Sequence, residues 1–585
     1  MTDIVDFAVV GGGIAGIYAA WRLANAPAEA LAKLVPHSAK PSVYLYESTG
    51  RLGGRLLTVT IPGTPFCAEL GGMRYASSQL LMSGLISELQ LDSRPFQFET
   101  CLMYLRGQHF RPQASPPYRL KPGEEHRDPG ELIKYAVRLA LREVAFKRDD
   151  AETRGIRERL KSLENEHEEL RLSILKPNQW ALLKKEATLQ GAGLTEIGFW
   201  NLLAYYLSSE AFLFSHDGLG YESVLANWNA AEAIPWFLRD FGVDYLTLDR
   251  GMEILPTTVD FKFSEESSGT WYTQRKRNLR HELTSIKPVE GSDGRLLGLS
   301  FLVDGVEGRS TKDVVARYVI LSLPRKPLKE KLNLSGVPGY TQHTWHDLLD
   351  SVAPHPLFKL FLGYDRGWWR DPRAIGGTSG RVTTDLPIRQ VYYFTNEGAG
   401  TSHAMAMASY SDAHYVDFWD PLLVSPGRQF YYRGAEPLGK NEESVLRLYG
   451  ATERMVHKAH RQILQLHPDM PPDEIPKPYV AVVMNWNRPP YDYGGWHTWN
   501  VSSDLVKDRP WEVRQKLVRP FDAHVYVCGE AYSCEQGWVE GALRSAEMVL
   551  NRLGIPSAKW IDKVDFRSQG FEGLADYVEC APSQS

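Results

Sequence analysis

Three glycines close to the N-terminus have the spacing of a turn that binds phosphate groups: Gly11, Gly13 and Gly16. In this pattern the first glycine permits a tight turn, the second lets the backbone approach a pyrophosphate, and the third allows close packing of helix on strand. Ile14 and Ala15 open the expected helix, where unpaired N–H groups and the positive end of the helix dipole favour an anion. The chemistry expected of this segment is therefore the binding of a dinucleotide.

An acidic residue follows in the position that dinucleotide-binding proteins use to bind a ribose. Glu47 ends the apolar segment 43–46, and its carboxylate could accept hydrogen bonds from the ribose diol. The acid usually lies about 20 residues beyond the glycines, and here the interval is longer. We interpret residues 25–41, rich in Ala and Pro, as a lengthened helix-to-strand connection that accounts for the difference.

The elements that position these residues come from both ends of the chain. The apolar run 5–10 predicts a strand, a helix should follow through residue 23, and 43–46 predicts a second strand. Residues 525–527 predict another short strand, followed by Gly529, Glu530 and a helix over about 537–553. The two distant segments should therefore contribute to one nucleotide-binding domain.

Composition limits the other functions that the chain could have. At 585 residues it is long enough for two or three domains, and a formal net charge of −5 argues against binding of nucleic acid. It has no apolar run of 18 residues, which argues against a membrane span. The first strand begins too early for a signal peptide, and the five cysteines lack metal-ligand spacing. We therefore expect no metal, reduced cysteines and a cytoplasmic location.

The ordered motifs of the chain resemble those of the flavin-dependent amine oxidase superfamily, and more narrowly its L-amino acid oxidases. The resemblance covers most of the chain and is weakest over residues 110–235. Beyond the first glycine motif, it is carried by Glu47, Arg51-x-Gly53-Gly54-Arg55, Glu69-Leu70-Gly71-Gly72-Met73-Arg74, Gly251-Met252 before Leu255-Pro256, Lys359, Trp486, Gly529-Glu530 and Gly537-Trp538-Val539-Glu540-Gly541-Ala542.

The resemblance implies FAD as the cofactor. Arg55 would make a charge-assisted contact beside the pyrophosphate and flavin, and Gly71 and Gly72 would pass close to the isoalloxazine ring. The implied cofactor-binding residues are Gly11, Gly13, Ile14, Ala15, Gly16, Glu47, Arg51, Gly53, Gly54, Arg55, Gly71, Gly72, Met73, Arg74, Trp486, Gly529, Glu530, Gly537, Trp538 and Val539. Monoamine oxidases attach FAD to a cysteine in a Gly-Gly-Cys segment, and residues 493–499 here contain none. We therefore expect FAD to bind non-covalently.

The resemblance also implies how a substrate would be held. Arg74 would pair with the α-carboxylate of an amino acid through its planar fork, and the Tyr410 hydroxyl would contact the same group. The Gly537 carbonyl would accept a hydrogen bond from the substrate amine, beside a wall formed by Trp538. Lys359, which has apolar neighbours, would hold a water near flavin N5. Arg74, Tyr410, Trp538 and Lys359 are thus the expected catalytic residues.

The function predicted on this basis is FAD-dependent oxidation of an L-amino acid to the 2-oxo acid, ammonia and hydrogen peroxide, by hydride transfer from Cα to flavin N5. An L-amino acid 2-monooxygenase and an amine or polyamine oxidase are the alternatives; a flavin-fold binding protein without turnover is a fourth possibility. A homodimer is a family expectation. Side-chain specificity stays open: acidic residues (Asp217, Glu222 and Glu232) could meet a basic side chain, or aromatic ones (Phe212, Phe214 and Trp228) could line an aromatic pocket.

The expected fold is mixed α/β: a Rossmann-like FAD-binding domain, a mixed-sheet substrate domain and a helical insertion. The predicted division assigns residues 1–76, 241–330 and 481–565 to the FAD-binding domain, 77–110 and 331–480 to the substrate domain, 111–240 to the helical domain and 566–585 to a C-terminal tail.

Overall fold

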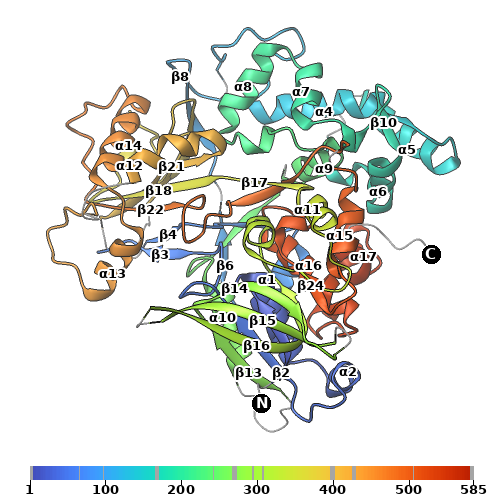
Figure 1. Cartoon of the computed structure of the whole chain (residues 1–585). Helices are drawn as coiled ribbons and strands as arrows, with labels where there is room; N and C mark the ends of the chain where they lie inside the picture. The colour runs from blue at the N-terminus through green and yellow to red at the C-terminus, as the bar shows by residue number, and fades with distance from the viewer. Residues whose placement is uncertain are drawn as a thin grey trace.

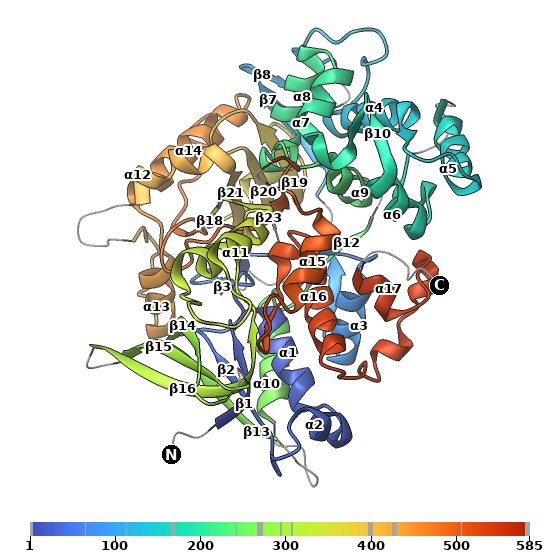
Figure 2. The same ribbon diagram turned by 45° about the vertical axis from the view of Figure 1, so that its right-hand side comes forward.

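The structure is a computed structural model of the whole chain. It describes residues 4–64, 66–96, 98–112, 114–164, 170–240, 243–265, 273–292, 295–305, 308–395, 402–423, 430–504 and 506–579. In two views, the N-terminus and one large sheet lie at the bottom of the molecule, whereas a second sheet and a group of helices lie at the top (Figures 1 and 2). The mixed α/β class predicted from the sequence is confirmed.

The lower sheet, here called the nucleotide sheet, has seven strands drawn from three distant parts of the chain. Its strands are β1 (Ile4–Val10), β2 (Ser42–Tyr46), β13 (Gln274–Asn278), β14 (His281–Pro288), β15 (Leu297–Gly305), β16 (Gly308–Leu321) and β24 (Val525–Val527). Five of them pair in parallel, in the order β13-β2-β1-β16-β24, and β15 and β14 continue antiparallel beside the first half of β16. The predicted joining of the two chain ends is confirmed.

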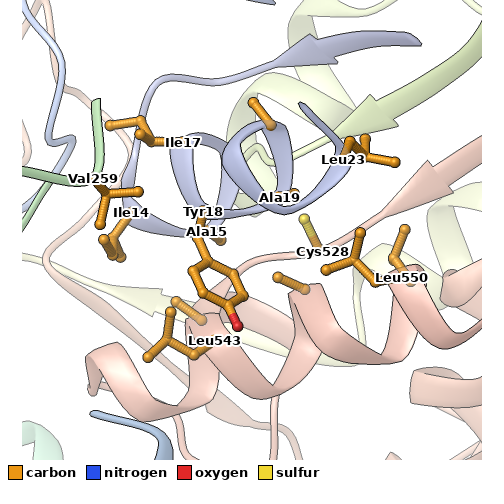
Figure 3. Close-up of a cluster of buried hydrophobic side chains, with 14 of the residues drawn as sticks. Ile14, Ala15, Ile17, Tyr18, Ala19, Leu23, Val259, Cys528, Leu543 and Leu550 are labelled. Carbon is orange, nitrogen blue, oxygen red and sulfur yellow. The ribbon is translucent and has the colours of Figure 1, made fainter. Parts of the chain in front are cut away.

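Three helices cover one face of this sheet: α1 (Ile14–Ala24), α10 (Ile254–Ser264) and α16 (Val539–Arg552). Figure 3 shows side chains of α1 pointing toward α16, with Tyr18 and Leu543 in the shared core. Burial of these apolar side chains stabilises the contact by roughly 25 cal/mol per Å² removed from water. The predicted connection over residues 25–41 is more ordered than expected, because it contains the short helix α2 (Ala28–Leu34).

The second sheet also has seven strands, in the order β22-β18-β21-β20-β19-β7-β8. These are β7 (Thr100–Leu105), β8 (Gln108–Phe110), β18 (Leu357–Tyr364), β19 (Ser379–Thr384), β20 (Gln390–Phe394), β21 (Ala404–Asp412) and β22 (Val480–Asn485). Among the described strands of this second sheet, only the β19–β7 pair is parallel. Alternation along central β18 places Leu360 in the core on one face and Phe361 in the core on the other. Helix α14 (Glu453–Leu466) packs on the Leu360 side.

Residues 129–240 form a compact group of helices, here called the helical segment, at the upper right of Figure 2. Its helices are α4 (Pro129–Glu143), α5 (Ala151–Lys161), α6 (Pro177–Glu186), α7 (Phe199–Tyr206), α8 (Ser209–Leu219) and α9 (Ala230–Asp240). Asp128 caps α4, accepting from the Glu131 N–H, while the Glu131 side chain accepts from the Asp128 N–H. The segment has its own apolar core, to which Trp496 of the C-terminal region also contributes.

Shorter elements connect these units. They are β3 (Thr58–Thr60), β4 (Cys67–Glu69), β5 (Tyr75–Ala76), α3 (Leu80–Glu88), β6 (Ser93–Pro95), β9 (Ala145–Phe146), β10 (Ala187–Leu189), β11 (Ala192–Gly193), β12 (Tyr245–Leu248), α11 (Gln342–Leu349), β17 (Val352–His355), α12 (Asp420–Leu423), α13 (Lys440–Tyr449), β23 (Trp496–Trp499), α15 (Pro510–Val518) and α17 (Leu574–Glu579). Within the predicted tail, α17 packs against α16, and residues 580–585 lie outside the described part of the chain. The domain boundaries stay a prediction.

Two further sequence expectations concern cysteines and membranes. Cys67, Cys101 and Cys528 are free thiols, but Cys534 is disulfide-bonded, so the expectation of reduced cysteines is wrong for Cys534; Cys580 is not among the described residues. Across the described residues, the helices are too short or too polar for any of them to pass through a lipid bilayer.

Candidate functional site

A cavity of about 960 Å³ runs between the nucleotide sheet, the second sheet and the helical segment. It is lined by most of the residues that the sequence predicts for cofactor and substrate: Gly11, Gly13, Ile14, Ala15, Glu47, Gly53, Gly54, Arg55, Gly71, Gly72, Met73, Arg74, Tyr410, Trp486, Gly529, Glu530, Gly537, Trp538 and Val539. Residues separated by hundreds of positions in the chain are therefore brought to one site. The size is within the range of small-molecule and cofactor sites.

The glycine turn after β1 forms part of this lining. A Cβ added at Gly13 would have only Gly54 Cα near it, at 4.0 Å, so the backbone is open to a bound group at this point. Gly54 has φ +57°, and its own added Cβ would lie 3.0 Å from Gly13 Cα. The close approach and the positive φ thus favour glycine at position 54, whereas at Gly13 the absence of a side chain leaves space beside the backbone. Together the two segments form a narrow backbone cradle suited to a pyrophosphate.

Glu47 lies at the end of β2, beside the turn. Its Oε2 accepts the Gly12 N–H at 2.7 Å, and its Oε1 accepts the Thr49 N–H at 2.8 Å. These two bonds fix the carboxylate at the edge of the cavity. A carboxylate held in this place has further acceptor capacity for the hydroxyls of a ribose.

Three predicted residues, all within the described part of the chain, lie behind the cavity lining. A Cβ added at Gly16 would lie 2.0 Å from Gly11 O, so this glycine serves the packing of α1 on the turn. The Arg51 guanidinium turns back to donate to the carbonyls of Leu52 and Leu56, at 2.6 and 3.0 Å, and so supports the loop. Lys359 donates to the carbonyl of Gly71, and Gly71, not Lys359, lines the cavity.

Lys359 is almost fully buried, and its ammonium group has backbone partners. Nζ donates to Gly71 O at 2.6 Å and to Glu69 O at 3.1 Å, and it lies 4.6 Å from the centre of the Tyr410 ring. Burial lowers the pKa of Lys359 to about 7, against the attraction of the Glu69 carboxylate. Burial likewise raises the pKa of Glu69 to about 7, although the Met252 N–H and the Thr58 hydroxyl donate to its carboxylate.

On the other side of the cavity, the Glu530 carboxylate has several hydrogen-bond partners. Its Oε2 accepts from Arg55 Nη1 at 2.7 Å and lies 2.9 Å from His497 Nδ1, and its Oε1 accepts from the Gly537 N–H at 2.7 Å. Burial disfavours the charged form of Glu530, but Arg55 and His497 outweigh burial and hold the pKa of Glu530 well below its usual range. Burial lowers the pKa of His497, which is fully enclosed. His497 was not predicted from the sequence, although it lies just after the Gly494-Gly495 segment.

Arg74 lies in a part of the cavity that is rich in aromatic side chains. Its guanidinium carbon is 4.0 Å from the centre of the Tyr245 ring and 5.8 Å from that of Phe96. Tyr245 in turn stacks on Trp538, with ring centres 6.0 Å apart and planes inclined by 11°. Burial raises the pKa of Tyr410, although the positive charge of Arg74 opposes this rise. Tyr410 is therefore a neutral hydroxyl near a permanent cation, a combination that suits the binding of a carboxylate.

Several residues of this aromatic part of the cavity were not predicted from the sequence. Tyr221, Val224, Trp236 and Phe237 of the helical segment line the cavity, together with Trp496, Phe98 and Arg381. Phe212, Phe214 and Trp228, which the sequence suggested as the lining of an aromatic substrate pocket, belong instead to the core of the helical segment. The acidic alternative fails too: Asp217 accepts from the Tyr118 hydroxyl, Glu222 pairs with His414, and Glu232 pairs with Lys184. These six residues are described, and none of them is among the lining residues.

The sequence matches the family model described as flavin containing amine oxidoreductase over residues 14–428. Similar curated proteins include Aplysianin-A of Aplysia kurodai (25% identical; 94% of this chain and 90% of the relative covered), Achacin of Lissachatina fulica (25%; 94% and 93%) and an L-amino-acid oxidase of Mus musculus (24%; 93% and 71%). Among solved structures, wild-type putrescine oxidase bound to putrescine superposes with a TM-score of 0.58 at 16% identity, covering 95% of this chain and all of that one. At that identity the likeness concerns the fold alone.

The family match, the backbone cradle and the cofactor-sized cavity agree with one another. Gly13 and Gly54 leave room for a pyrophosphate, and Glu47 is placed for a ribose. Gly72 and Trp486, which the resemblance assigns to the flavin ring, line the same cavity. FAD therefore fits the residues that are present. The chain belongs to the flavin-containing amine oxidoreductase family and is an FAD-dependent oxidoreductase of the amine oxidase type.

Proposed function

We propose that the protein is an L-amino acid oxidase. In the overall reaction an L-amino acid, O2 and water give a 2-oxo acid, ammonia and hydrogen peroxide. FAD, when bound, supplies the acceptor for the hydride that leaves Cα. The observation that carries the proposal is the position of Arg74 in the cavity lining, within 4.0 Å of the Tyr245 ring centre and close to Tyr410. A simple amine has no group that needs a guanidinium at this point.

The residues of the chain would hold both ends of the substrate. The Arg74 fork would bind the two oxygens of the α-carboxylate, and the Tyr410 hydroxyl would donate to the same group. The Gly537 carbonyl would accept from the amine, because the Gly537 N–H is already committed to Glu530. With both ends fixed, Cα–H has one orientation, which is the contribution of positioning to the rate. The rings of Trp538 and Tyr245 would exclude water from this part of the cavity.

Lys359 has no contact with the cavity that would let it bind the amino acid directly, and its ammonium instead lies below the Gly71 backbone. We assign it to the reaction with O2. Oxygen acquires negative charge when it is reduced, and a nearby cation stabilises that charge. A cytoplasmic location and a homodimer stay predictions from composition and from the resemblance.

The test is a panel of the common L-amino acids, assayed for oxygen uptake with the FAD-loaded protein. The proposal expects one hydrogen peroxide per O2 consumed and a 2-oxo acid as product. An amide product without peroxide would instead identify a 2-monooxygenase. Oxidation of putrescine or another polyamine, with all amino acids unreactive, would identify an amine oxidase.

A further inference from the structure

One helix of the helical segment contacts the loop that carries Gly537 and Trp538. Helix α9 faces residues 533–538, which connect the short turn of 3-10 helix at Glu530–Tyr532 to α16. Trp236 Nε1 donates to Gln536 O at 3.0 Å. Three residues further along α9, the Arg239 guanidinium forms an ion pair with the Glu535 carboxylate. Since positions i and i+3 lie on the same face of a helix, α9 holds two successive residues of the loop with one face.

The loop has little freedom once these contacts are made. The Glu535 side chain is 1% exposed, so its charge requires partners, and it lies between Arg239 of α9 and Arg544 of α16, the latter at 3.4 Å. Gln536 Nε2 donates to Ala531 O at 2.6 Å, and the Gly537 N–H donates to Glu530. The peptide that joins Gln536 to Gly537 is thus bonded through the Gln536 carbonyl to Trp236 and through the Gly537 N–H to Glu530.

Trp236 also belongs to the cavity wall. Its ring stacks on Trp496, with ring centres 5.5 Å apart and planes inclined by 29°, and both rings line the cavity. Trp496 Nε1 in turn donates to Ser223 Oγ, again in the helical segment. The indole of Trp236 therefore touches the cavity with its ring and the Gln536 carbonyl with its N–H.

We propose that Trp236 and Arg239 are positioning residues that set the direction of the Gly537 carbonyl, and with it the amine-binding end of the substrate site. The inference rests on the proposed function, which assigns the substrate amine to that carbonyl. It gives the helical segment a part in the reaction: α9 fixes the amine end, whereas Arg74 and Tyr410 fix the carboxylate end independently. Loosening α9 should weaken recognition of the amine and leave recognition of the carboxylate intact.

The experiment compares two ligands that differ only in the amine. L-Phenylalanine presents both ends, and 3-phenylpropanoate presents the carboxylate alone; if another amino acid is the most active of the panel, that amino acid and its own deaminated acid take their place. Trp236→Phe keeps an aromatic ring beside Trp496 and removes the indole N–H together with part of the ring system. Trp180→Phe is the matched control, because Trp180 Nε1 donates to Leu172 O at 2.7 Å in the same segment but outside the cavity lining.

For Trp236→Phe we expect the rate of anaerobic flavin reduction at limiting amino acid to fall about tenfold, as for loss of one hydrogen bond. The dissociation constant of 3-phenylpropanoate should stay within about twofold of that of the wild type, and Trp180→Phe should change neither quantity. Arg239→Gln should show the same split between the two ligands, which keeps the test available if Trp236→Phe does not fold. Equal weakening of the binding of both ligands, or equal behaviour of Trp236→Phe and Trp180→Phe, would overturn the inference.

If the wild-type flavin is reduced by none of the amino acids, the proposed function itself fails, and that result is seen before any variant is made.

Discussion

Arg55 and Glu530 form an ion pair at 2.7 Å although 475 positions separate them in the chain. The pair joins the loop after β2 to the loop after β24 across the cavity, and His497 lies against the same carboxylate. Because Glu530 also accepts the Gly537 N–H, this carboxylate links the expected cofactor region to the expected amine-binding end of the substrate site.

Removal of the charge on Glu530 should therefore weaken both flavin retention and stability. For Glu530→Gln we expect a loss of about 3 kcal/mol of unfolding free energy, since Arg55 loses its countercharge and one of the two acceptor oxygens becomes a donor amide. Denaturant unfolding and the FAD content of the purified protein measure the two effects. Asp371→Asn is the control, because the Asp371–Arg373 pair lies at the surface and should contribute little to stability. Equal stability of Glu530→Gln and the wild type would contradict the role given to this residue.

The two glycines Gly13 and Gly16 should respond differently to the same substitution. Gly13 has φ −74°, and an added Cβ there points into open space, so Gly13→Ala should fold normally and lose most of its FAD. At Gly16 the added Cβ would lie 2.0 Å from Gly11 O, so Gly16→Ala should lose about 1–3 kcal/mol of stability even without cofactor. Thermal melting of the flavin-free proteins and their FAD dissociation constants separate the two effects. A Gly13→Ala protein that binds FAD as tightly as the wild type would show that no phosphate approaches this position.

Lys359 should give the reaction with oxygen a pH dependence. Burial places the pKa values of Lys359 and Glu69 both at about 7, so the pair becomes more negative as pH rises through 7, whichever of the two loses its proton. We expect reoxidation by O2 to slow as pH rises through about 7. Stopped-flow mixing of chemically reduced enzyme with O2 measures this step without a titrating substrate amine. In Lys359→Met, reoxidation by O2 should be slower, and its rate should show no inflection near pH 7. Lys287→Met, at an exposed position on β14, should keep the inflection. An unchanged inflection in Lys359→Met would assign it to another group.

Tyr410 should contribute to carboxylate binding through its hydroxyl alone. Tyr410→Phe keeps the ring beside Lys359 and removes one donor, so KM for the best amino acid should rise about tenfold with little change in kcat. Steady-state oxygen uptake gives both constants. If kcat falls and KM stays constant, the hydroxyl acts in the chemical step and not in binding.

The sequence was most informative where local spacing alone dictates geometry. The order of Gly11, Gly13 and Gly16 predicted a turn that joins a strand to a helix, and the structure has β1 and α1 in these places. The contribution of the apolar run before Gly529 and Glu530 to the nucleotide-binding domain was also predicted, but its pairing partner was not; the structure pairs β24 with β16.

Long-range contacts account for what the sequence did not predict. Arg51 could not be distinguished from Arg55, because both flank the same glycines, and only the fold shows that Arg51 turns toward backbone carbonyls. Trp236 and His497 lie in no recognisable motif, and their positions depend on long-range contacts: Trp236 bonds to Gln536, and His497 lies against Glu530. The disulfide bond of Cys534 likewise depends on contacts made in the folded chain and has no signal in the local sequence.

The proposed function depends on the selection by Arg74 of a substrate with an α-carboxylate. The most direct measurement is anaerobic reduction of the flavin by an L-amino acid and by the amine that lacks only its carboxylate, such as L-phenylalanine and phenethylamine. We expect the flavin of the wild type to be reduced by the amino acid at least 100-fold faster than by the amine, about the contribution of a buried charge-assisted pair. Arg74→Lys should retain part of this preference and Arg74→Ala should lose it. Equal reduction of the wild type by both compounds, or full preference in Arg74→Ala, would contradict the claim.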